Sequence, residues 1–318
     1  MGTKMSEAYY TEENKVIKIN YANKAMNGSL KCKTEKCRVP VIFVDAHKKK
    51  YADKTVVVNA YFRLESSEKN SHDIDCKYNT KGQVKVIARE SDDSIIKAIE
   101  EGKYNFRLNI IDEALRALNS SKKDEIENEE TSYALKRPSK VYVNKGKLNS
   151  YFSTMQRIME LRSLTETNDE LRELIELQYD KQKIKWSKFY FESDDLSRCY
   201  TYIKRNDVTH PMCIEGALKG IVPPNENFKF HVLKLRSPWV EPDGSGVINL
   251  PTVELIINNN KVLEYIQSNA SLGNVAVYSK FRINESKIYV KQVQNGMEKF
   301  RYLNIKGNLY HPKQILLY

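Results

Sequence analysis

The chain has 318 residues, of which 41% are hydrophobic and 10% aromatic, enough for two or three domains with at least one full core. This composition excludes a mainly disordered protein, and no run of about eighteen apolar residues marks a membrane span. The net charge of +11 favours an anionic partner. Five cysteines without the spacing of a secreted disulfide framework predict a reducing, cytoplasmic location.

The charge is unevenly distributed along the chain. Residues 1–90 carry 18 Lys and Arg against 11 Asp and Glu, and residues 206–318 carry 13 against 9, whereas residues 91–205 balance at 21 against 21. Pattern and charge together predict an α+β multidomain protein with three parts. These are a β-rich zinc-binding module (1–91), a mainly helical region (92–205) and a small OB-like β-barrel (206–318).

The pattern of the first part predicts a series of short strands that are rich in β-branched residues and bounded by turn residues. A helix then follows at 92–102, with Asp near its start and Gly at its end. The strand predictions are "KVIKINYA" (15–22), "VPVIFVDA" (39–46), "KTVVVNAYFRL" (54–64) and "GQVKVIAR" (82–89).

The middle part shows apolar residues at three- and four-residue spacing, which predicts helices. A helix is expected within 109–130, where an apolar face (Ile111, Ala114, Leu115 and Leu118) precedes an acidic tail interpreted as a loop, and another is expected at 148–164. A third, at 167–186, is expected to lie antiparallel to the second. The stripe of Met and aromatic side chains at 148–159 is interpreted as core and not as a ligand pocket.

The last part has the element order of a five-stranded OB barrel, whose helix lies between the third and fourth strands. The predicted elements are strands 213–222, 228–235 and 251–258, helix 260–271, and strands 275–284 and 287–294 joined by a turn at 284–286. Residues 299–307 and 313–318 would be additions to the barrel.

Two close pairs of metal ligands lie in polar stretches near the N-terminus. Cys32 and Cys37 are separated by four residues, and His72 and Cys76 by three. Tetrahedral zinc takes four such ligands, and a pair on one tight turn supplies two of them with little loop entropy. An unligated thiol among Lys, Glu and Asp would be exposed to oxidation. We therefore predict a Cys3His zinc site, with His47 as a less favoured fourth ligand.

About 55 residues around this site resemble the N-terminal element of the competence-protein CoiA family. The resemblance is carried by Gly28, Cys32, Cys37, the run "AYFRL" at 60–64, His72 and Cys76. A nuclease domain follows this element in that family. Its acidic motif is not found here, so the resemblance implies the zinc element and not the activity.

Other candidate sites have simpler structural explanations. Cys199, His210 and Cys213 lack a fourth ligand nearby, and both cysteines are interpreted as core residues. The acidic run 191–196 could hold magnesium, but it is also typical of a helix N-terminus. The chain has no lipase-type elbow, phosphate-binding loop or His-Glu-x-x-His helix, and we expect no catalytic residue.

Three functions remain open on these observations. The favoured one is a zinc-containing nucleic-acid-binding protein of a bacterium or mobile element, with single-stranded DNA or RNA as the target. Aromatic and basic residues alternate in its predicted stacking platform: Tyr278, Lys280, Phe281, Arg282, Tyr289 and Lys291. The alternatives are a zinc-stabilised interaction subunit that binds an acidic protein surface, as in an antiviral defence complex, and a metal-dependent nuclease of unrecognised motif.

Overall fold

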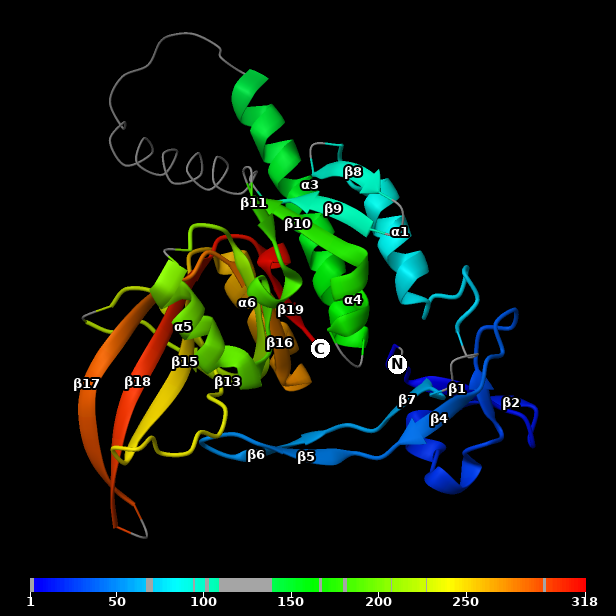
Figure 1. Cartoon of the computed structure of the whole chain (residues 1–318), viewed down its shortest axis with the longest axis horizontal. Helices are drawn as coiled ribbons and strands as arrows, with labels where there is room; N and C mark the ends of the chain where they lie inside the picture. The colour runs from blue at the N-terminus through cyan, green and yellow to red at the C-terminus, as the bar shows by residue number, and fades with distance from the viewer. Residues whose placement is uncertain are drawn as a thin grey trace.

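A computed structural model of the chain is strand-rich, with an N-terminal group of small sheets and a large C-terminal sheet. The structure describes residues 3–66, 71–93, 95–100, 103–108, 139–165, 168–179, 182–206, 208–226, 228–293 and 296–318. In Figure 1 the N-terminal strands (blue) and the C-terminal sheet (yellow-green to red) lie toward opposite ends of the long axis, and the ribbon β5–β6 runs between them. None of the helices in the described part has both the length and the apolar composition of a membrane span.

The N-terminal strands form three small antiparallel groups. The sheet order is β2-β1-β3, and β4 pairs with β7 and β5 with β6. The strands are β1 Glu7–Tyr10, β2 Lys15–Lys18, β3 Leu30–Cys32, β4 Val41–Val44, β5 His47–Lys50, β6 Thr55–Val58 and β7 Tyr61–Leu64, with 3-10 helices η1 Ile19–Tyr21 and η2 Lys24–Met26. The predicted strands at 15–22, 39–46 and 54–64 are confirmed in position, although each is shorter or interrupted.

Two predictions at the junction with the middle part are wrong. Residues 82–89 belong to helix α1, Thr80–Glu90, and not to a strand. Val84, Ile87 and Ala88 are the buried residues of α1 that belong to the core, so the helical period of its apolar face outweighs its β-branched composition. Residues 92–102, expected to be helical, instead contain strand β8, Ile96–Glu100.

The middle part combines one long helix with a small sheet. The predicted helix at 148–164 is confirmed within α3, Ser139–Leu164, and its Met and aromatic stripe lies in the core. The predicted helix at 167–186 is wrong beyond its first turns. Its residues form α4 Asp169–Leu174, β10 Ile175–Tyr179, β11 Gln182–Ile184 and the 3-10 helix η3 Trp186–Lys188. The helix expected at 109–130 lies outside the described residues.

The sheet of the middle part has the order β11-β10-β9-β8, in which β9, Lys103–Arg107, is parallel to β10. Helix α3 and this sheet contribute side chains to one apolar core, and so do α1 and the C-terminal strands. The three-domain division of the chain stays a prediction.

The C-terminal sheet has eight strands in the order β17-β18-β15-β14-β13-β16-β19, with β12 beside β13. Its elements are β12 Tyr190–Phe191, η4 Ser193–Asp195, α5 Leu196–Asn206, β13 Met212–Val222, β14 His231–Leu235, β15 Val247–Ile257, α6 Asn260–Asn269, η5 Ala270–Leu272, β16 Asn274–Ser279, β17 Arg282–Val293, β18 Gly296–Leu309, η6 Pro312–Gln314 and β19 Ile315–Leu317. The predicted strands and helix are confirmed as far as residue 279. The predicted turn at 284–286 is instead a bulge within the continuous strand β17.

The hydrogen-bonded strands do not close this sheet into a barrel, because the path ends at β17 on one side and β19 on the other. Strand β16 separates two cores. Val275 and Val277 face the core of the sheet and its two helices, whereas Ala276 and Tyr278 face the core shared with α3. A strand buried on both faces accounts for the nearly continuous apolar run at 275–278.

Candidate metal centre

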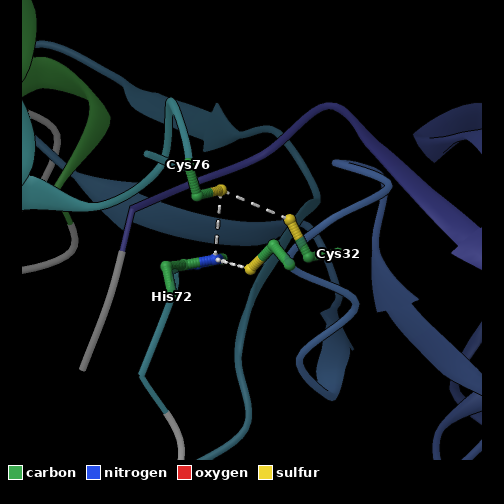
Figure 2. A group of neighbouring side chains, drawn as sticks. Cys32, His72 and Cys76 are labelled. Atoms are coloured by element: carbon green, nitrogen blue, oxygen red, sulfur yellow. Dashed lines mark hydrogen bonds between the residues drawn. The ribbon is translucent and has the colours of Figure 1, made fainter. Parts of the chain in front are cut away.

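Cys32, Cys37, His72 and Cys76 meet at one point in the N-terminal module, as the sequence predicts. Their ligand atoms all lie within 4.8 Å of one another. The Cys32 and Cys76 sulfurs are 3.7 Å apart, and His72 Nδ1 lies 3.4 Å from the Cys37 sulfur and 3.6 Å from the Cys76 sulfur. Figure 2 shows the side chains of Cys32, His72 and Cys76 pointing toward one another. The arrangement is compatible with a metal site.

The first pair is held by the turn that follows β3. Cys32 is the last residue of β3, and its N–H donates to Val39 O at 2.8 Å. Cys37 N–H donates to Thr34 O at 2.9 Å, and the next residue, Arg38, has a left-handed φ of 43°. The chain therefore doubles back within six residues, which places the two sulfurs on the same side of the turn.

The second pair is held by the start of helix α1. Asn79 caps this helix by accepting from Gly82 N–H at 2.8 Å, and its Nδ2 donates to His72 O at 2.8 Å and Asp73 O at 3.1 Å. A Cβ on Gly82 would lie 2.5 Å from Ile74 O. Because no side chain fits that gap, the glycine allows the ligand turn to pack directly on the helix.

Burial shifts the pKa values of two of the candidate ligands, Cys32 and His72, toward their uncharged forms. Burial raises the pKa of the Cys32 thiol to about 12, although hydrogen bonds from Thr34 act in the opposite direction. Burial also lowers the pKa of His72, so its imidazole is neutral and can donate a lone pair. A bound cation would stabilise the thiolates that burial disfavours. Asp73 N–H and the Thr34 hydroxyl lie 3.4 Å from the Cys37 and Cys76 sulfurs and would support such ligands.

Among the described residues, these four form the one group of three or more His, Cys, Asp and Glu side chains able to share an ion. His47, the less favoured ligand, begins β5 and is exposed. Cys199 and Cys213 are buried in different cores, which confirms their interpretation as core residues. His210 contacts the Tyr202 hydroxyl and the Pro211 carbonyl, each at 3.0 Å.

The acidic run 191–196 leads into α5 through the 3-10 helix Ser193–Asp195. Asp195 pairs with Arg198 at 2.7 Å, and Asp194 with Lys49 at 3.0 Å. These contacts fit a helix N-terminus.

The six residues of the predicted stacking platform fall into two groups. Tyr278 and Phe281 are 0% and 5% exposed, so the expectation of an open ring face is wrong for both, because each packs in a core. Lys280 is half-buried, with its Nζ 5.7 Å from the centre of the Tyr179 ring. Arg282, Tyr289 and Lys291 are exposed on β17.

Sequence reasoning missed two partners of Tyr289. It pairs across the ladder with Phe300, and its ring centre lies 5.8 Å from that of Tyr302. The signal was present in the run "KFRYLN" (299–304), in which Phe300 and Tyr302 have the two-residue period of one strand face.

No family model matches the chain, and a search of curated proteins finds no match either.

Proposed function

We propose that the metal is zinc and that it holds the N-terminal module together. Zinc bonds of about 2.3 Å to sulfur and about 2.0 Å to nitrogen, arranged tetrahedrally, place two sulfurs about 3.8 Å apart and sulfur and nitrogen about 3.5 Å apart. The distances of 3.7, 3.4 and 3.6 Å among these ligands support that ion. Free thiols at all five cysteines suit a reducing, cytoplasmic location.

Although its hydrogen-bonded strands leave it open, the C-terminal sheet is proposed to follow the strand path of an OB-like barrel. Hydrogen-bonded pairing joins the strands in the order β17-β18-β15-β14-β13-β16. The two ends of this path, β16 and β17, are consecutive in the chain and are separated only by Lys280 and Phe281. At the break, Asn308 N–H donates to Ser279 Oγ at 3.2 Å, and that hydroxyl donates to Asn308 O at 2.9 Å. Small barrels of this kind bind oligonucleotides.

The protein is proposed to bind single-stranded nucleic acid through the outer face of β17 and β18. Ile283 and Ile305 pair with each other and face the core, so the alternate positions face outward. The bulge between Glu285 and Ile288 shifts the register. The outer face then comprises Arg282, Tyr289, Lys291, Phe300, Tyr302 and Lys306.

This outer face is the observation that carries the proposal. Tyr289 is 54% exposed beside Tyr302 and opposite Phe300. Exposed aromatic rings among cations are the platform on which bases stack while phosphates are neutralised. The resemblance to the CoiA-type element adds no activity, and nuclease function is not proposed.

The proposal is tested by fluorescence anisotropy with single-stranded DNA, single-stranded RNA and duplex probes. If about five phosphates are neutralised, the log–log salt slope is near −3.5, and affinity falls roughly a hundredfold between about 50 and 200 mM salt. Tyr289→Ala should cost about 1–3 kcal/mol of binding without changing the slope. Lys291→Ala should instead flatten the slope by about 0.7.

Two controls separate these effects from unfolding. Tyr289→Phe keeps the ring face and should bind as the parent does, and Lys261→Ala removes an exposed charge from α6 and should leave the slope unchanged. Absence of binding to every probe at micromolar protein, or a flat salt dependence, would contradict the proposal.

A protein-interaction subunit is the second candidate, and one observation favours it. Ile288, Val290 and Met297 are 46%, 56% and 68% exposed on the opposite face of the same ribbon, as the register requires. Adjacent exposed apolar side chains are typical of protein contact surfaces. Flat salt dependence together with loss of a protein partner in Val290→Asp would support this function.

A further inference from the structure

The ribbon β5–β6 has no apolar core of its own. Within the described chain its two strands pair only with each other, and most of their side chains are exposed or half-buried, with Val57 57% exposed. An isolated two-stranded ribbon is marginal in water. The position of this ribbon between the two ends of the molecule (Figure 1) therefore depends on contacts near its turn.

Those contacts are made with the loop after β14. Ala52 N–H donates to Ser237 O at 3.0 Å, and Tyr51 forms a β-bridge with Pro238. The Lys50 ammonium lies 3.6 Å from the centre of the Trp239 ring. The docked ribbon thus covers one face of a tryptophan that is still 48% exposed.

Two ion pairs complete the contact. Asp53 pairs with Arg236, whose side chain is only 12% exposed, and Lys49 pairs with Asp194 at 3.0 Å. Burial alone would lower the pKa of Lys49, but the hydrogen bond and charge of Asp194 raise it. Salt weakens partly exposed ion pairs of this kind.

We propose that β5–β6 is a salt-sensitive latch between the N-terminal module and the C-terminal sheet. Docked, it ties the two together through the Tyr51–Pro238 bridge with its Ala52–Ser237 hydrogen bond, the two ion pairs and the cation–π contact. Released, it frees Lys49, Lys50, Arg236 and Trp239 as a basic and aromatic set. An anion that binds this set would favour the released form, because a ligand shifts an equilibrium toward the state it binds better. The inference does not rest on the proposed function.

The latch is tested on the full chain by fluorine NMR with fluorotryptophan and by hydrogen exchange of the Ala52 amide. The chain has two tryptophans, and Trp239→Phe assigns the signals. Between about 50 and 500 mM NaCl the Trp239 signal should move and the Ala52 amide should exchange faster. Trp186, buried and stacked on Tyr190, should keep its signal.

Variants distinguish the latch from a local effect on the ring. Lys50→Ala should shift the docked-to-released ratio about fivefold toward release. Asp53→Asn does not alter the residue on Trp239, yet should also speed Ala52 exchange at low salt. Lys48→Ala removes the same charge from the same strand and should behave as the parent. The latch is overturned if Asp53→Asn matches Lys48→Ala in both measurements, or if the Ala52 amide is insensitive to salt.

Discussion

The N-terminal module and the C-terminal sheet are both β-rich, but their interiors differ. Among the described residues, the N-terminal core contains eleven buried side chains, two of which are the candidate metal ligands Cys32 and Cys76. In the same described part of the chain, the core of the C-terminal sheet contains twenty-one, and its cysteine, Cys199, belongs to no group of candidate metal ligands. A small apolar core rarely supports a fold by itself. The comparison supports the proposal that a bound metal stabilises the first region as apolar burial stabilises the second.

The largest expected difference comes from the same substitution in each region. Cys76→Ser should lower metal affinity by more than about a hundredfold, because even indirect partners of a ligand contribute roughly ten- to a hundredfold. Ligation and local folding are coupled, so amide protection should be lost in residues 3–66 and 71–78 and kept in the C-terminal sheet. Metal analysis and hydrogen exchange measure both effects.

Cys199→Ser is the matched change. It places a hydroxyl in an apolar core and should lower the free energy of unfolding of the C-terminal region by about 1–3 kcal/mol. The metal content of this variant should equal that of the parent. Equal loss of amide protection in both regions of Cys76→Ser would show that the two regions unfold as one unit. That result would contradict the proposed difference between them.

A smaller effect is expected from two helix caps with similar contacts. Asn79 caps α1 and donates to His72 O, and Asn259 caps α6 by accepting from Lys261 N–H and donates to Tyr310 O. Replacing either asparagine with alanine should lower the free energy of unfolding by about 1 kcal/mol. Only Asn79→Ala should also lower metal affinity, by about tenfold, because its carbonyl partner belongs to a ligand. Competition with a chromophoric chelator measures that affinity, and an equal affinity in the two variants would contradict this role for Asn79.

The metal ligands could be predicted from the sequence because their chemistry is local. Cysteines and a histidine paired at short spacing among charged residues predict shared ligands. The expectation that their thiols would otherwise be exposed is wrong for Cys32 and Cys76, because both are buried in the N-terminal core. The register of turns around them could not be predicted, since it depends on the close approach of Gly82 to Ile74 O. Asn79 and Gly82 did carry a signal for the start of α1, a capping residue before an apolar period, which the β-branched residues Val84, Val86 and Ile87 obscured.

The errors elsewhere come from non-local pairing. Strand β10 aligns with β9 through pairs such as Leu177 with Phe106, about seventy residues away, so the short sequence 175–179 continued a helical pattern with no local sign of a sheet. The prediction that Tyr278 has an open ring face was wrong for a related reason. Its strand is buried on both faces, and alternation of side chains cannot show which face is open when neither is.

The most direct test of the account is the metal content of the full chain purified without chelator. We expect about one zinc per chain, and cobalt substitution should give the absorption of a tetrahedral site with three thiolates and one imidazole. Chelation should then remove protection from the N-terminal module before the C-terminal sheet. Metal-free protein in which the N-terminal amides remain as protected as those of the sheet would contradict the central claim.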